Sequence, residues 1–217
     1  MTSLITPYHP FKDPIPDVMQ LAVRAWVSWL KSIFGARPPG SYKWSPDQSA
    51  TDIVIVDQGP IQLESPNLRP SIITMMGAST WAGQGMTTML TLDNLADGVP
   101  ITYQGLINAA FSINFIAKEG AEARKIAYYV FRLLPVFEKV LQKMGLHGVV
   151  NNLVLGQETS PGALVQGSSM SEWKMVPLQA PFFIKDTLSM DSSGEDSFQP
   201  MIQYITMRMT TMLNGGS

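Results

Sequence analysis

Apolar residues alternate with other residues along the segment between positions 101 and 117. The apolar set falls on every second residue, with Gly105 as the one gap: Ile101, Tyr103, Ile107, Ala109, Phe111, Ile113, Phe115 and Ala117. A period of two over this length is typical of a strand with one core face and one more polar face. We therefore predict a single long strand over residues 101–117.

The period changes to that of a helix after residues 118–120. Apolar residues then recur three and four positions apart, at Ala123, Ile126, Ala127, Val130, Phe131, Leu134, Phe137, Leu141 and Met144. This stripe predicts an amphipathic helix over residues 121–144. Pro135 lies inside it and is expected to kink it, because proline lacks a backbone donor. Gly145 is the expected stop.

The N-terminal region divides into an arm and a helix. Residues 1–16 are interrupted by prolines and predict an extended arm. An apolar stretch that includes Trp26 and Trp29 predicts a helix over residues 18–34, capped by Asp13 or Asp17 and ended at Gly35. This stretch is short for a membrane span and is interrupted by charges, so we expect it to pack on the sheet of its own chain.

Shorter strands are predicted on both sides of this central unit. Before it come strands at 53–56, 61–63 and 71–76, a glycine-rich loop at 77–85, and a strand at 88–92 that would form a long antiparallel hairpin with residues 101–117. After it come a strand at 149–155, a loop at 160–171 and one or two strands over 173–188, broken at Pro177 and Pro181. An acidic turn at 191–196 and a final strand at 201–212 follow.

This order of elements predicts an α+β fold. Two main helices would pack on one face of a mostly antiparallel sheet that carries a long β-hairpin. Strands do not alternate regularly with helices, so a doubly wound parallel sheet does not fit. We assign residues 1–16 to the arm, 17–213 to a single α+β domain and 214–217 to a flexible C-terminal tail.

Composition adds a hint of assembly. Charged residues make up 15% of the 217 positions, against about 25% in typical proteins. A charge-poor chain with 14 methionines is expected to cover part of its surface with neighbours, and extra core methionine is the alternative reading. The absence of cysteine excludes disulfides and thiolate metal sites. The net charge of −2 argues against general nucleic-acid binding, and the cations of residues 124–139 read as a solvated helix face.

The sequence has no group of residues with the spacing of an active site. His9 and His147 occur in unrelated contexts and read as surface or loop residues. The glycines at 77–85 are not followed by the Lys–Ser/Thr pair of a phosphate loop, and no G-x-S-x-G motif occurs. We therefore predict that the protein is not an enzyme and uses no metal or cofactor; only a carboxylate pair hidden by the fold would reverse this.

The segment INFIAKEGAEARKIAYYVFRLLPVFEKVL at residues 113–141 leads from a strand through a short polar turn into an Ala-rich amphipathic helix. Together with the order of elements over residues 17–210, it resembles tail terminator and related neck proteins of tailed bacteriophages. The resemblance implies a virion protein, assembled in the host cytoplasm, that forms a homo-oligomeric, hexameric ring. Its implied partners are portal-side connector proteins and tail-tube or sheath proteins, with DNA passing through an axial channel and no membrane.

Candidate contact residues follow from this resemblance. Trp44 and Trp81 lie in loop-like contexts and either pack within the chain or anchor a partner. The other interface candidates are Met86, Met201, Met207 and Met209. Candidates for the channel or its rim are Gln104, Asn108 and Asn114 on the polar strand face and Asp191, Glu195 and Asp196 in the acidic turn, since an acidic wall would let DNA slide.

Two other functions stay open at this stage. The chain could be another neck or tail component, such as a stopper, an adaptor or a baseplate subunit. It could also be a small-ligand or lipid-binding module that uses the helix of residues 121–144 over a curved sheet.

Overall fold

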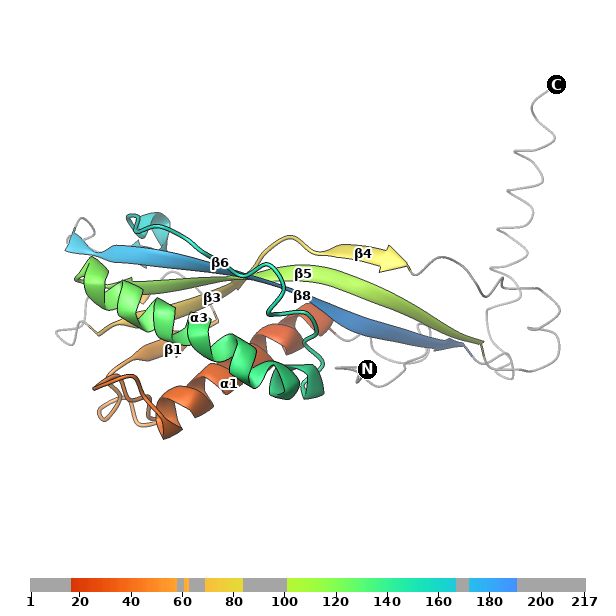
Figure 1. Ribbon diagram of the computed structural model, residues 1–217, viewed down its shortest axis with the longest axis horizontal. Coiled ribbons are helices and arrows are strands. Elements are labelled where there is room, and N and C mark those ends of the chain that lie inside the picture. Colours follow the sequence, from red (N-terminus) through yellow and green to blue (C-terminus); the bar gives the residue numbers. More distant parts are fainter. Residues whose placement is uncertain (1–16, 58–60, 63–68, 84–100, 167–171, 191–217) are drawn as a thin grey trace, which may run out of the picture.

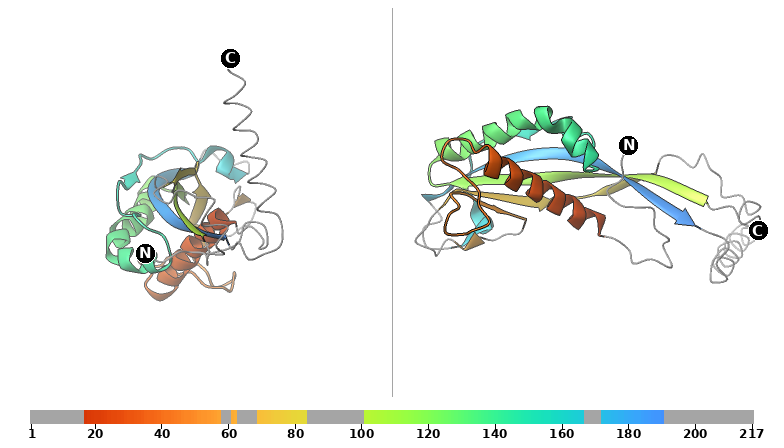
Figure 2. Two further views of the ribbon diagram at one scale, coloured as in Figure 1. Left: turned by 90° about the vertical axis from the view of Figure 1, so that its right-hand side faces the viewer. Right: turned by 90° about the horizontal axis from the view of Figure 1, so that it is seen from below.

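The computed structural model describes residues 17–57, 61–62, 69–83, 101–166 and 172–190. Two long helices, α1 (Val18–Ala36) and α3 (Gly120–Lys143), cover one face of a sheet (Figure 1). Strands β5 (Ile101–Ala117) and β8 (Lys174–Met190) run side by side well beyond both helices, as the view from below also shows (Figure 2). The α+β class is therefore correct.

The main sheet has the strand order β1-β3-β5-β8-β6, and β4 pairs with β5 beside β3. Its shorter strands are β1 (Val54–Val56), β3 (Ser71–Met76), β4 (Thr80–Gly83) and β6 (Val154–Leu155). The pair β1–β3 is parallel, and the pairs β3–β5, β4–β5, β5–β8 and β6–β8 are antiparallel, so the described sheet is mixed with an antiparallel majority. Strands β2 (Ile61–Gln62) and β7 (Val165–Gln166) form a separate parallel pair.

Strand β5 has the bounds that its two-residue period predicts. Its long antiparallel partner is β8, in continuous register from Ile101 opposite Met190 to Ala117 opposite Lys174. This pairing joins segments separated by α3, whereas the hairpin partner expected at residues 88–92 lies outside the described residues. Along its other side β5 pairs first with β3 and then with β4, and residues 77–79 bulge between the two.

Strand β8 is continuous through both of its prolines, so the breaks predicted at Pro177 and Pro181 are wrong. The carbonyl of Pro177 accepts a hydrogen bond from the N–H of Gly156 (2.7 Å), on the side of β8 away from β5. Backbone groups of residues two apart point to the same side of a strand, so Pro181 faces that outer side as well. Neither ring nitrogen is needed for the ladder with β5, which is why the prolines are tolerated.

Other boundaries also differ from the sequence prediction. Strand β4 occupies part of the loop expected at 77–85, because β5 offers it a free edge to pair with. The strand expected at 149–155 shrinks to β6, because Gly148 and Asn152 adopt positive φ angles (72° and 63°) that turn the chain first. The loop expected at 160–171 contains the short 3₁₀ helix Gly162–Leu164 and β7. The arm 1–16, the strand 201–212 and the tail 214–217 lie outside the described residues.

Both helices are capped by identifiable groups. The Asp17 carboxylate accepts the N–H of Gln20 (2.9 Å) and so starts α1, which ends two residues later than predicted. Helix α3 continues through Pro135 as one element. At its end Gly145 has a φ of 88°, and Leu146 N–H donates to the Leu141 carbonyl (2.9 Å). This is a Schellman stop, and the predicted role of Gly145 is confirmed.

The main core lies between the helices and the alternate residues of β5 and β8 that face them. Trp26 packs on Phe111 with ring centroids 4.8 Å apart, and Phe111 stacks on Phe182 at 4.2 Å. Trp26 and Trp29 are buried, as predicted. On the opposite face of the sheet, Ile73, Ile116 and Trp173 form a second, small cluster.

Candidate interaction surfaces

An apolar groove of about 680 Å³ runs between α1 and α3. Its lining residues are Ser28, Trp29, Ser32, Ile33, Ala36, Arg37, Tyr129, Leu133, Val136, Phe137, Val140 and Met144. Two of its valines are exposed, Val136 at 74% and Val140 at 43%. An apolar patch of this kind on a surface marks a place where another molecule can bind.

One hydrogen bond ties the two helices together at this groove. The Tyr129 hydroxyl donates to the backbone carbonyl of Arg37, just past the last residue of α1. Partial burial raises the pKa of the Tyr129 hydroxyl, an effect that the nearby Arg37 charge opposes. The phenol therefore stays protonated and keeps its donor role at neutral pH. This bond therefore joins α3 to the end of α1 where both helices line the groove.

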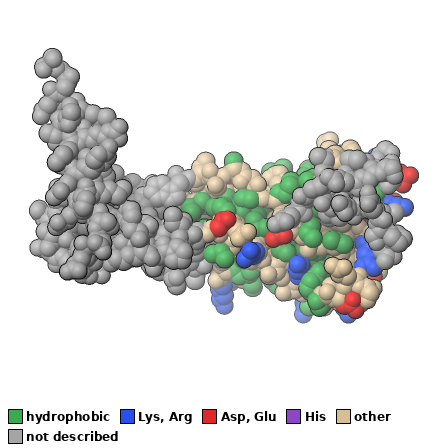
Figure 3. Space-filling model, turned by 180° about the vertical axis from the view of Figure 1, so that it is seen from behind, with side chains coloured by type: hydrophobic (Ala, Val, Ile, Leu, Met, Phe, Trp, Pro, Cys, Tyr) green, Lys and Arg blue, Asp and Glu red, His purple; other side chains and the backbone are tan. Residues whose placement is uncertain are grey.

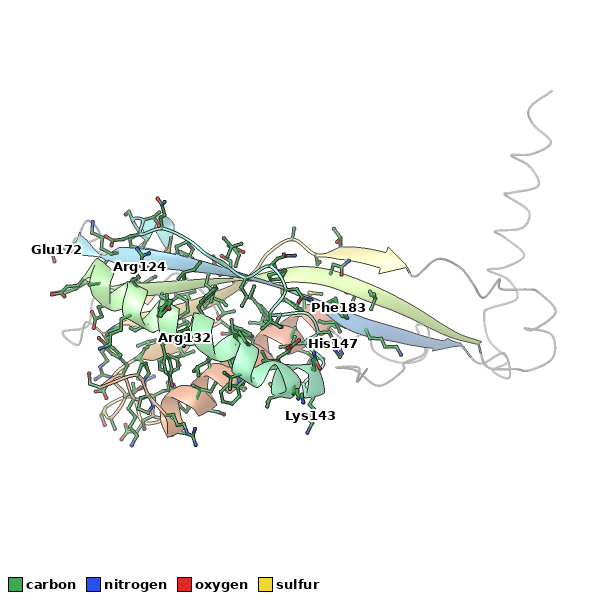
Figure 4. All side chains as sticks on the ribbon, viewed as in Figure 1. Arg124, Arg132, Lys143, His147, Glu172 and Phe183 are labelled. Atoms are coloured by element: carbon green, nitrogen blue, oxygen red, sulfur yellow. The ribbon has the colours of Figure 1, made fainter. Side chains whose placement is uncertain are left out.

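Cationic side chains follow the exposed side of α3 next to this groove. We call Arg124, Arg132, Lys139 and Lys143 the basic ridge; each is exposed. At 100° per residue they lie within about 100° of arc on the helix. Figure 4 labels Arg124, Arg132 and Lys143 in succession along α3. Within the described ranges no ion pair joins a carboxylate to any of the four, so the ridge presents its charge to solvent.

Aromatic side chains accompany two of the cations of α3. The Arg132 guanidinium lies 6.0 Å from the ring centre of Tyr128, which is itself 52% exposed. Lys125 instead extends toward Tyr42, at 6.0 Å from its ring centre. Helix α3 carries five cations but only two carboxylates, Glu122 and Glu138, in a chain whose net charge is −2.

A smaller polar hollow of about 560 Å³ lies beyond the end of α3. It is lined by Glu138, Lys139, Gln142, Lys143, His147, Gly148, Asn151 and Phe183. His147 stacks on Phe183 with ring centres 5.3 Å apart and exchanges backbone hydrogen bonds with it. His147 is in a loop, as expected, but it is buried (6% exposed).

The structure places two of the predicted interface residues. Trp44 is half-buried against the main core. Its backbone N–H donates to the Phe34 carbonyl (3.2 Å), and Lys31 Nζ lies 5.5 Å from the centre of its ring. Trp44 therefore packs within its own chain. Trp81 lies in β4, with its backbone opposite Ile107. Met86, Met201, Met207 and Met209 lie outside the described residues.

The predicted channel residues do not form one solvated face. Asn108 is exposed, and Gln104 lies in β5 opposite Thr187. Asn114 is 3% exposed and its Nδ2 finds no hydrogen-bond partner among the described residues. The expectation of a solvent-lining Asn114 is therefore corrected, because Ile73 and Pro177 flank it on the neighbouring strands. Asp191, Glu195 and Asp196 lie outside the described residues.

The groove and the basic ridge were not identified as sites from the sequence. A signal for the groove was present, since Val136 and Val140 are apolar but fall beside the stripe that builds the core. The sequence predicts a solvated helix face for the ridge, and the structure adds that its cations are aligned and form no ion pair with a carboxylate among the described residues. The reverse side of the molecule shows mostly hydrophobic and uncharged groups, with charges scattered between them (Figure 3).

Other site types receive no support in the part of the chain that the structure describes. No three histidine, cysteine or acidic side chains gather there as metal ligands would. No helix among these residues has both the length and the apolar character needed to cross a bilayer. In comparisons with models of known families and with curated proteins, the sequence matches none.

Proposed function

We propose that this protein is a structural subunit of the neck of a tailed bacteriophage. Copies of it form a closed ring that ends the tail tube and joins it to the head connector. The assignment to a phage neck rests on the resemblance of residues 113–141 and of the element order to tail terminator proteins. The observation that carries the assembly role is the ribbon formed by β5 and β8, which extends past both helices (Figure 1).

The end of this ribbon is narrow. Strand β4 pairs with residues 105–108 of β5. Beyond it, residues 101–104 of β5 pair only with residues 187–190 of β8 among the described residues, so the ribbon is two strands wide there. A two-stranded ribbon has little stability of its own in water. Its backbone edges are suited to pairing with a strand of another chain. We therefore expect the ribbon to be covered when copies assemble.

The apolar groove and the low charge support the same proposal. An exposed groove lined by Trp29, Tyr129 and Phe137 has the aromatic content of a contact surface. A ring requires two different, complementary surfaces on each copy, because its contacts run head to tail. The ribbon of β5 and β8 and the groove between α1 and α3 lie at different places on the chain and supply two such surfaces.

Electron microscopy with purified tail tubes tests the proposal. A tail terminator is expected to bind at one end of each tube and to stop further growth of the tube when added during polymerisation. Binding along the tube, at the baseplate end or only to the connector would instead identify a sheath-like, baseplate or stopper role. No binding to either tubes or connectors would contradict a neck function.

The groove also favours a second candidate function, that of a small-ligand or lipid-binding module. A volume of about 680 Å³ lies within the range of about 300–1,000 Å³ that is usual for small-molecule sites. Mass spectrometry of the purified protein under denaturing and native conditions distinguishes the two. A ligand present in stoichiometric amount, and lost when Val140 is replaced by lysine, would favour the binding module.

A further inference from the structure

We propose that the basic ridge of α3 receives the acidic segment 191–196 of a neighbouring copy of this chain. This inference rests on the proposed function and specifies one contact of the ring. The proposed contact would connect the ribbon end of one copy with helix α3 of the next, since residues 191–196 follow directly on Met190 at the end of β8. The ridge supplies the complementary surface.

The ridge is extended and its charge is available. From Arg124 to Lys143 it spans twenty residues of helix, and the nineteen steps between them cover about 28 Å at 1.5 Å per residue. Among the described residues no ion pair neutralises any of its four cations. Unpaired cations along one helix face, in a chain with only 15% charged residues, call for an anionic partner.

The segment 191–196 has the matching chemistry. Its sequence, DSSGED, contains three of the chain's seventeen acidic residues and no basic one. The three carboxylates, Asp191, Glu195 and Asp196, face three or four cations in the proposed contact. Opposite patches of this kind steer association and set the orientation of the partners.

We place the contact between copies, because the segment cannot reach Arg132 or Arg124 of its own chain. His147, just past the end of α3, pairs with Phe183 of β8. Met190 lies seven residues farther along the strand, which is about 23 Å at 3.3 Å per residue. Six extended residues span at most about 20 Å, and Arg132 lies about 16 Å back along α3 from Lys143. Strand β8 itself runs on past the C-terminal end of α3 (Figure 1).

Charge reversal with rescue tests this contact. The ridge variant is R124E/R132E/K139E, the segment variant is D191K/E195K/D196K, and a third variant combines all six changes. The control R24E/K43E/K118E makes the same change in net charge at exposed positions outside the ridge. Self-association is measured by sedimentation velocity at about 50 mM salt, where screening is weak, and circular dichroism checks that each variant is folded.

We expect the ridge variant and the segment variant each to self-associate at least about tenfold more weakly than the wild type. The variant with all six changes should self-associate to within about threefold of the wild type. The control variant should self-associate as strongly as the wild type. Raising the salt to about 500 mM should weaken the self-association of the wild type toward that of the ridge variant and the segment variant. Rescue is the decisive result, because loss alone could follow from general repulsion.

Three results would overturn the inference. The contact is wrong if the wild type forms rings and the ridge variant forms them as well. It is also wrong if the ridge variant loses the rings and the variant with all six changes does not restore them. In both cases the proposed ring itself is not contradicted. If the ridge variant loses affinity for duplex DNA and keeps its self-association, the ridge serves nucleic acid instead. If the wild type does not self-associate at any concentration, both the contact and the proposed ring fail.

Discussion

Ala110 and Pro181 lie directly opposite each other in β5 and β8. The Ala110 carbonyl accepts the N–H of Gly77 (2.8 Å), so its backbone faces the other neighbour of β5. Pro181 turns its nitrogen to the outer side of β8, as Pro177 does. At this pair neither backbone takes part in the hydrogen bonds between β5 and β8. A proline therefore fits there without loss of a ladder hydrogen bond.

This arrangement predicts opposite effects for proline at neighbouring positions of β8. Replacing Pro181 with alanine should change the free energy of unfolding by no more than about 1 kcal/mol, because no ladder bond is involved. Placing proline at Ala180, which faces Phe111, should destabilise the protein by about 1–3 kcal/mol or more, because it removes a donor and leaves a buried acceptor unpaired. Urea denaturation measures both, and equal effects would contradict the assigned strand sides.

Thr74 is fully buried in β3, and its hydroxyl has no hydrogen-bond partner among the described residues. Thr74→Val keeps the shape and removes the unpaired hydroxyl, so it should leave stability unchanged or raise it by about 1 kcal/mol. Thr51 is the matched control, because its hydroxyl accepts the N–H of Ser45 and donates to the Ile53 carbonyl. Thr51→Val should cost about 1–2 kcal/mol in the same assay; a reversed order of the two would contradict the structure.

Tyr129 predicts a loss of stability at alkaline pH. Burial raises the pKa of its hydroxyl above the ordinary value of about 10, so the folded chain holds this proton more tightly than the unfolded chain does. The resulting stabilisation is fully present below about pH 10 and declines as the pH rises through the folded pKa. Tyr42 shifts in the same direction, through burial and a hydrogen bond to Glu122, and adds to the decline.

The substitution Tyr129→Phe isolates the first of these groups. It should lower the free energy of unfolding by about 1 kcal/mol at pH 7, because the bond to the Arg37 carbonyl is lost. As the pH rises above about 10, its stability should then fall less steeply than that of the wild type. Denaturation curves across this range provide the measurement, and parallel pH profiles would show that Tyr129 does not contribute.

Substitution of the exposed valines of the groove tests whether the groove is a contact surface without disturbing the core. Val136→Lys with Val140→Lys should alter stability by less than about 1 kcal/mol, because both side chains already contact solvent. If the groove is a contact surface, this double variant should self-associate at least about tenfold more weakly. Val154→Lys on β6, at 57% exposure, is the control and should associate normally. Unchanged association of the double variant would remove the groove from the interface.

The long regular elements could be predicted from periodicity. Strand β5 and helix α3 match their predicted spans to within a residue, because each keeps one hydrophobic period over many residues. Asp17 and Gly145 could be assigned as helix ends because capping depends on local chemistry. These features need no knowledge of the partner strand.

Features that depend on the tertiary partner could not be predicted. Pro177 and Pro181 read as strand breakers, since only the sheet order shows that their nitrogens face outward. Strand β4 is rich in small residues and exists through its pairing with β5. Asn114 has the right parity for the polar face, but the neighbours that bury it come from β3 and β8. The groove required the relative placement of two helices far apart in the sequence.

Native mass spectrometry of the full-length wild-type protein, at several concentrations and low salt, tests the central claim most directly. Each chain has a mass of 23.9 kDa. We predict that one integer multiple of this mass dominates at the higher concentrations and corresponds to a closed ring, hexameric if the resemblance to tail terminators is right. A monomer at every concentration, with or without tail tubes, would contradict the claim that this chain is a ring-forming assembly subunit.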